Sequence, residues 1–124
     1  MSSRWVKVCK VTDVPKNSGV CVLLENNPIA LFRTEESDAI YAVGNYDPIG
    51  DANVLSRGIM TDIDGRWMIA SPLYKHHYCL KTGVCFEDDG ISIPVYPAQV
   101  NSGVVELKSM PKSLEQSEVL EEMA

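Results

Sequence analysis

The fold of this chain is decided by the stretch Ser71-Pro72-Leu73-Tyr74-Lys75-His76-His77-Tyr78-Cys79-Leu80-Lys81-Thr82-Gly83. It begins as a loop around a proline and then carries the chain's densest set of metal-binding residue types: His76, His77 and Cys79, with Cys85 beyond. Side chains alternate between the faces of a strand, so His77 and Cys79 would share one face and His76 the other. A structural zinc site needs four ligands in closely paired spacing, and this spacing does not match. We therefore favour buried thiols and two partly exposed histidines over zinc.

Short runs rich in β-branched and aromatic residues lie on both sides of this stretch. We expect strands over residues 5–8, 19–24, 29–33, 40–43, 67–70, 91–96 and 104–107. Turn signals separate them at 26–28, 62–65, 88–90 and 101–103. Many short strands without a sustained helical period predict an all-β sandwich or barrel of antiparallel strands. Pro94 and Pro97 predict that the strand between them lies at a sheet edge or bends there.

Length and composition limit the class of protein. A chain of 124 residues with 45% hydrophobic and 23% charged residues fits one globular domain. Its longest apolar run, residues 20–24, has five residues, against roughly 20 for a membrane span. A net charge of −6 without a basic patch argues against a nucleic-acid partner. The chain shows no secretory signal and has four cysteines, so we expect a cytoplasmic protein with reduced thiols and no membrane partner.

The end of the sequence differs from the rest. One basic and four acidic residues follow Pro111, and Ser113 with Gln116 resembles a capping box. A helix this short is marginal alone in water. We expect a β domain over residues 1–111 and an acidic C-terminal tail over residues 112–124, forming a short helix that docks on this or another chain.

Nucleophilic catalysis has little support in the sequence. Ser71 precedes a proline outside any G-x-S-x-G elbow, and neither histidine has an evident carboxylate to orient it. Asp62-x-Asp64-Gly65 begins like a calcium loop, but Leu73 stands where the bidentate glutamate is needed. A stand-alone enzyme that uses Cys79 or Cys85 stays an alternative, and it requires an unusually reactive thiol.

Read together, three segments resemble Rieske iron–sulfur domains. Residues 42–49, Ala-Val-Gly-Asn-Tyr-Asp-Pro-Ile, resemble the lead-in A-V-x-N-x and the ligand loop C-P-H. Residues 71–83 resemble the second loop, C-P-x-H-G-x-x-F-x-L-x-T-G, and residues 93–103 resemble the closing hairpin, L-P-V-Y-P-V-x-V-x-x-G. The resemblance covers Trp5 to Leu107 in the right order, and it implies a Rieske-like fold.

The departures from this pattern fall on the cluster ligands. A Rieske [2Fe–2S] centre takes two thiolates on one iron and two imidazoles on the other. Here Asp47 and Ser71 stand at the cysteine positions, and Ile49 and Tyr74 stand at the histidine positions. We therefore expect the fold without the cluster, and no metal on this chain. We expect Asp47 and Ser71 to bond local backbone amides, and Ile49 and Tyr74 to fill the space left by the metal.

The replacements resemble one subgroup of these domains. Asp-Pro at 47–48, Val-Leu-Ser-Arg-Gly at 54–58 and Ser-Pro-Leu at 71–73 are similar to the small subunits of cytosolic NADH-dependent assimilatory nitrite reductases. This resemblance implies a partner, the large catalytic subunit of nitrite reductase, which carries FAD, sirohaem and a [4Fe–4S] cluster and reduces nitrite to ammonium. It implies no catalytic residue and no cofactor on this chain.

The loop tip is a candidate docking surface. We place Tyr74, Lys75, His76 and His77 on it because aromatic and basic side chains are good interface anchors. Ordinary loop and strand roles remain the alternative at each position, and we favour them for the histidines. Two other functions also stay open: an electron-transfer ferredoxin that binds its cluster through unexpected ligands, and an interaction module that serves another oxidoreductase.

Overall fold

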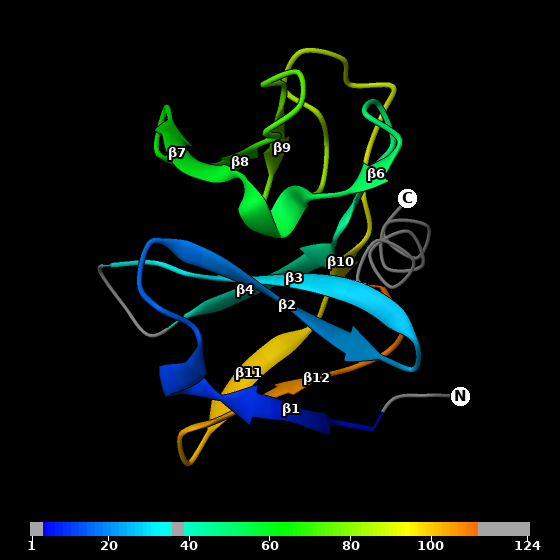
Figure 1. Cartoon of the computed structure of the whole chain (residues 1–124). Helices are drawn as coiled ribbons and strands as arrows, with labels where there is room; N and C mark the ends of the chain where they lie inside the picture. The colour runs from blue at the N-terminus through cyan, green and yellow to red at the C-terminus, as the bar shows by residue number, and fades with distance from the viewer. Residues whose placement is uncertain (1–3, 36–38, 112–124) are drawn as a thin grey trace, which may run out of the picture.

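The computed structural model describes residues 4–35 and 39–111, and strands make up most of its regular structure. Three sheets are stacked (Figure 1). The first sheet has the order β1-β12-β11, with strands β1 (Val6–Lys10), β12 (Val104–Leu107) and β11 (Ala98–Asn101). The second has the order β10-β4-β3-β2, with strands β10 (Val95–Tyr96), β4 (Ile40–Gly44), β3 (Asn27–Arg33) and β2 (Ser18–Leu24). All pairings between these strands are antiparallel.

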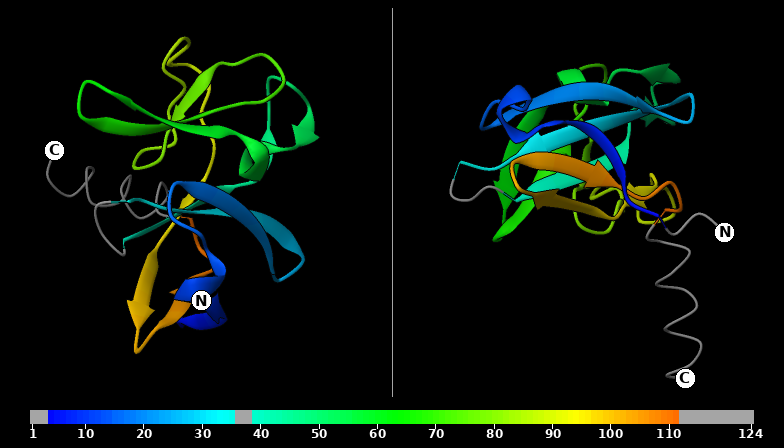
Figure 2. Two further views of the ribbon diagram at one scale, coloured as in Figure 1. Left: turned by 60° about the vertical axis from the view of Figure 1, so that its left-hand side comes forward. Right: turned by 90° about the horizontal axis from the view of Figure 1, so that it is seen from below.

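The third sheet has the order β7-β8-β9, with strands β7 (Ile59–Ile63), β8 (Arg66–Ala70) and β9 (His77–Cys79). Between the second and third sheets the chain forms a small antiparallel ribbon and a short 3-10 helix: β5 (Tyr46–Asp47), β6 (Ala52–Asn53) and η2 (Leu55–Arg57). A second 3-10 helix, η1 (Val11–Asp13), follows β1. Figure 2 shows the third sheet and the first on opposite sides of the second.

Strands β3 and β4 of the second sheet are buried on both faces along most of their length, whereas the edge strand β2 is partly exposed. Along β3, Ile29 and Leu31 point into a core shared with the first sheet, where Val105 and Leu107 lie. Alternate residues point the other way, so Phe32 belongs to the core beneath the third sheet, with partners Ala30, Leu55, Ile69, Tyr78 and Leu80. This double burial explains why β3 is apolar along most of its length instead of alternating. It also fixes the third sheet, whose loops carry the candidate site, on a rigid base.

The all-β prediction is confirmed, and the sheets remain open instead of closing into a barrel. Strand β10 lies at a sheet edge as its flanking prolines predicted, but it covers only Val95–Tyr96 of the expected 91–96. Turns were expected at Asp64-Gly65 and Ser102-Gly103, and in the structure all four residues have the positive φ values typical of tight turns. The strands expected from the sequence did not include β5, β6, β7, β9 or β11. The predicted tail at 112–124 lies outside the described residues. In the part of the chain that is described, no helix could span a membrane.

Candidate functional site

Two loops meet at the outer end of the molecule. The first follows β5, where the Asp51 amide donates to the Asp47 carbonyl oxygen at 2.7 Å. The second joins β8 to β9 and closes as a turn, in which the Lys75 amide donates to the Ser71 carbonyl oxygen at 3.0 Å. A Cβ atom at Gly50 would lie 2.5 Å from Leu73 Cδ1, so the two loops are packed against one another.

A buried carboxylate joins the two loops. Asp47 is fully buried, and its Oδ2 accepts a hydrogen bond from the Ser71 hydroxyl at 2.6 Å. His76 Nε2 lies 2.9 Å from Oδ1 and 3.1 Å from Oδ2, and the Tyr78 hydroxyl donates to Oδ1 at 2.8 Å. The Ile49 amide donates to Oδ1 at 3.0 Å. Both carboxylate oxygens are therefore satisfied, as a buried charge requires.

This network shifts two pKa values in opposite directions. Burial alone would raise the pKa of Asp47, but the hydrogen bonds from Ser71, His76 and Tyr78 outweigh it and lower the pKa to about 2. Burial and the neighbouring Asp47 carboxylate both raise the pKa of Tyr78. Asp47 is thus a charged acceptor and Tyr78 a neutral donor at neutral pH.

The arrangement of Ser71, Asp47 and His76 is not that of a hydrolase. In a serine triad the histidine lies between the serine and the carboxylate and takes the serine proton. Here Ser71 and His76 both bond to Asp47, so the Ser71 hydroxyl proton is directed to the carboxylate. Sequence reasoning found no carboxylate partner for a histidine because Asp47 and His76 are 29 positions apart.

A second histidine lies on the opposite face of β9. His77 Nδ1 is 2.6 Å from Glu87 Oε2, and the His77 amide donates to Glu87 Oε1 at 2.7 Å. Burial would raise the pKa of Glu87, but the backbone and ring of His77 lower it. The ring of His77 also meets Phe86 edge-on, at 6.5 Å between ring centroids. His77 is therefore fixed by contacts within the chain.

The two central cysteines are inaccessible. Cys79 is 3% exposed and Cys85 is 1% exposed. Burial raises the pKa of Cys85, whereas hydrogen bonds from Thr82 lower the pKa of Cys79 against its burial. A nucleophilic thiol needs access to its substrate as well as a low pKa, so the geometry disfavours a thiol enzyme.

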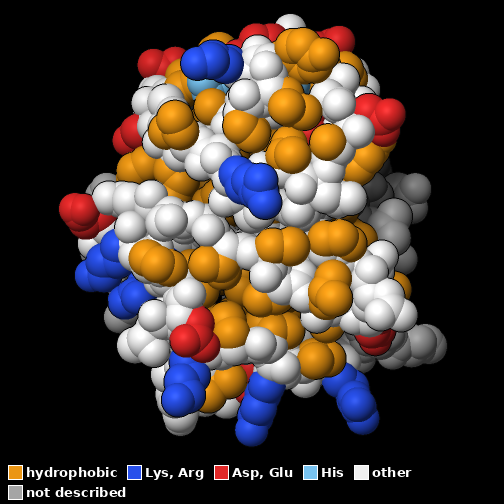
Figure 3. Space-filling model, in the orientation of Figure 1, with side chains coloured by type: hydrophobic (Ala, Val, Ile, Leu, Met, Phe, Trp, Pro, Cys, Tyr) orange, Lys and Arg blue, Asp and Glu red, His pale blue; other side chains and the backbone are white. Residues whose placement is uncertain are grey.

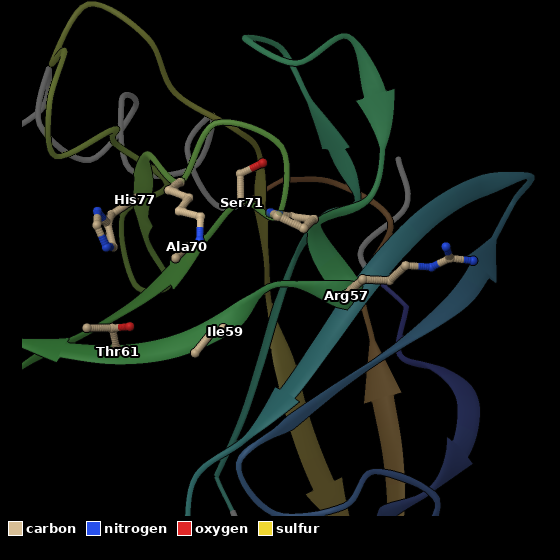
Figure 4. Close-up of a pocket in the computed structure, with 8 residues that line it drawn as sticks. Arg57, Ile59, Thr61, Ala70, Ser71 and His77 are labelled. Carbon is tan, nitrogen blue, oxygen red and sulfur yellow. The ribbon is translucent and has the colours of Figure 1, made fainter.

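A pocket of about 440 Å³ opens beside the second loop. Residues from η2, β7, the end of β8, the turn and β9 line it, among them Arg57, Ile59, Thr61, Lys75 and His77 (Figure 4). Arg57 and His77 lie at opposite ends, with Ile59 between them. Ser71 contributes to the same pocket, which places the pocket directly beside the Asp47 network.

Comparison with known proteins identifies the fold. The family model of the Rieske-like [2Fe–2S] domain matches residues 4–108. The chain belongs to this Rieske-like family. The small subunit of nitrite reductase (NADH) from Escherichia coli strain K12 is 41% identical over 106 residues, which cover 86% of this chain and 98% of that protein. The NMR structure of the E. coli protein NirD has a TM-score of 0.80 at 40% identity and covers 88% of this chain and 98% of its own.

One further relative of this Rieske-like chain is a longer protein. The large subunit of nitrite reductase [NAD(P)H] from Klebsiella oxytoca is 35% identical over 104 residues, covering 84% of this chain and 11% of that protein. A domain homologous to this chain is thus a minor part of that large polypeptide.

The residues at the loop tips of this Rieske-like chain do not fit the cluster that gives the family its name. Asp47 and Ser71, which the sequence resemblance predicts at the positions of the two thiolates, are hydrogen-bonded to each other at 2.6 Å, and the Ser71 oxygen also accepts from the Leu73 amide at 3.2 Å. Ile49 has no donor atom in its side chain. Among residues 4–35 and 39–111, no three His, Cys, Asp or Glu side chains are grouped to hold a metal ion.

The structure corrects three expectations at this tip. Ile49 is 38% exposed and Tyr74 is 70% exposed, so neither fills the position of a cluster; the Asp47 network occupies the space between the loops instead. His76 is only 8% exposed, because it is drawn inward to Asp47, whereas we expected it to be partly exposed. The predicted turn bonds of Asp47 and Ser71 to local amides are confirmed.

Proposed function

We propose that this chain is the non-catalytic small subunit of a cytoplasmic NADH-dependent nitrite reductase, which reduces nitrite to ammonium in nitrate and nitrite assimilation. Its similarity to the E. coli small subunit over nearly the whole of that protein supports the assignment. In this proposal the redox groups, FAD, sirohaem and a [4Fe–4S] cluster, belong to the large subunit. The small subunit contributes a rigid folded surface and no reacting group.

The relative from Klebsiella oxytoca supports the proposal that the partner is the large subunit. A domain homologous to this chain is joined to the large subunit in Klebsiella oxytoca. Joining two partners on one polypeptide raises their effective concentration without changing their contacts. In the present chain the same pairing would be made between separate polypeptides.

The Asp47 network supports a role without electron transfer. A charged carboxylate with its hydrogen bonds satisfied by Ser71, His76 and Tyr78 holds the two loops where a Rieske cluster would hold them. The alternative is an electron-transfer ferredoxin, and the [2Fe–2S] cluster in the description of the family favours it. Such a ferredoxin would need cluster ligands other than the four loop-tip residues Asp47, Ile49, Ser71 and Tyr74.

Isolation from cells tests the assignment. Tagged full-length chain recovered from nitrite-grown cells is expected to bring down a large flavin- and sirohaem-containing protein, with NADH-dependent nitrite consumption in the eluate. Recovery of the chain alone, under conditions where the reductase is expressed, would contradict the proposal. Recovery with a different oxidoreductase would favour the interaction-module alternative.

A further inference from the structure

The pocket beside the second loop has a charge opposite to that of the whole chain. The chain carries a net charge of −6, yet the charged side chains that line this pocket are the basic ones of Arg57 and Lys75, with His77 beside them. In the view of Figure 3, hydrophobic side chains cover much of the face, while acidic side chains lie mainly near its outline. The pocket is therefore complementary to an acidic partner.

The two cations are available for such a partner. Within the described ranges, neither Arg57 nor Lys75 has an acidic group within 4.0 Å, whereas the carboxylate of Glu87 is engaged by His77. The Arg57 side chain extends away from the centre of the pocket (Figure 4), so it lengthens the positive surface from one end. Lys75 supplies the charge at the turn itself.

Lys75 is also held in an unfavourable backbone conformation. Its φ of 61° lies in the left-handed region, where glycine and asparagine are favoured and lysine is not. The hydrogen bond from its amide to Ser71 closes the turn that imposes this conformation. The Asp47 network in turn fixes Ser71. A rigid loop thus presents a cation at a strained position, which is the pattern of a preorganised binding site.

The size and lining of the pocket favour a protein segment over a small ion. A volume of about 440 Å³ is many times the roughly 30 Å³ of one water molecule, so nitrite would leave most of it empty. Ile59, on the rim, is 72% exposed and lies on β7, an edge strand of its sheet. A partner segment with both carboxylates and aliphatic carbons would pair with the cations and cover Ile59.

We propose that this pocket anchors the interface with the large subunit and receives an acidic segment of that subunit, whose carboxylates pair with Lys75 and Arg57. The proposal rests on the proposed function. It shifts the docking surface from the tip toward β7, because Tyr74 and His76 do not line the pocket while Lys75 and His77 do. Tyr74 remains an exposed aromatic side chain on the same turn.

Binding of full-length small subunit to purified large subunit tests this inference. Lys75→Glu and Arg57→Glu are each expected to weaken binding and to raise the dissociation constant about tenfold or more. Lys10→Glu makes the same charge change at the exposed end of β1, in the first sheet, which lies on the other side of the second sheet from the pocket, and is expected to change the dissociation constant less than twofold. Rising salt is expected to weaken the wild-type complex and to affect the Lys75→Glu complex less.

A second variant separates binding from folding. Lys75→Gly removes the charge and relieves the backbone strain, so its midpoint of thermal unfolding should equal or exceed that of the wild type while its binding weakens. Equal binding by wild type, Lys75→Gly and Lys75→Glu would overturn the docking proposal and leave the proposed function standing. Failure of the wild type itself to bind the large subunit would overturn both. Binding of nitrite alone to the isolated chain, lost in Lys75→Glu, would identify a small-anion pocket and also overturn the docking proposal.

Discussion

The hydroxyl of Ser71 donates a 2.6 Å hydrogen bond to the carboxylate of Asp47, across 24 positions of sequence. The sequence resemblance predicts that these two residues stand at the positions that a Rieske domain gives to its two cysteine ligands. In this chain they hold the loops together directly. In a Rieske domain the metal cluster keeps two exposed loops in one geometry. In this chain the buried carboxylate of Asp47, with several hydrogen-bond donors, keeps them so.

Removing that charge should destabilise the whole tip. Asp47→Ala leaves the donors of Ser71, His76 and Tyr78 buried without their acceptor, and each buried donor left unsatisfied costs about 1–3 kcal/mol. Urea unfolding at pH 7 measures the change. Asp89→Ala, at an exposed turn position, is the control and should stay within about 0.5 kcal/mol of the wild type. A loss below about 1 kcal/mol for Asp47→Ala would show that the network does not hold the fold.

The depressed pKa of Asp47 makes the stability depend on acid pH. The pKa is about 2 in the folded chain against an ordinary 3.8, so ionised Asp47 contributes roughly 2 kcal/mol above pH 4. This contribution is lost as the pH falls from about 4 toward 2. The difference in unfolding free energy between wild type and Asp47→Asn, measured across that range, should shrink with acid. A constant difference would contradict the assignment.

Gly83, in the Thr82-Gly83 pair that follows β9, should be intolerant of any side chain. Its φ is +80°, and a Cβ atom would lie 2.1 Å from the Ile93 carbonyl oxygen. Gly65 has a φ of +81° with open space around it, which makes it a matched control. Gly65→Ala should cost about 1 kcal/mol, and Gly83→Ala about 3 kcal/mol or more, in thermal or chemical unfolding. Equal costs would mean that strain alone, without the close contact, explains the glycine.

The cysteines should differ sharply in reactivity. Cys21 is exposed, while Cys79 and Cys85 are buried. Alkylation followed by mass spectrometry should modify Cys21 in the folded chain, and Cys79 and Cys85 only after unfolding. Rapid modification of Cys79 or Cys85 in the folded protein would revive the thiol-enzyme alternative.

Local signals in the sequence were sufficient for most of the fold. β-Branched runs located β2, β3 and β4, and turn residues such as Asp64-Gly65 located turns with positive φ values. Strand β7 was missed because Gly58 and Asp62 made its surroundings resemble a loop. Strand β9 has only three residues, too short a run for a strand signal of its own.

The site was predictable only in part. The loop resemblance singled out Asp47 and Ser71, but nothing local shows that they bond to each other, since that contact depends on the packing of β5 against the β8–β9 loop. The alternation that placed His77 with Cys79 also puts His76 and Tyr78 together on the other face. That signal could have predicted that His76 is buried beside Tyr78, in an edge-to-face contact at 5.3 Å.

The absorption spectrum and iron content of the purified full-length chain, prepared without oxygen, test the central claim most directly. We predict a colourless protein with no bound iron and no sulfide, because the loop tips hold a carboxylate network where a cluster would lie. Visible bands of a [2Fe–2S] centre, with about two irons per chain and a low-temperature paramagnetic signal on reduction, would contradict the account and establish the chain as an electron carrier.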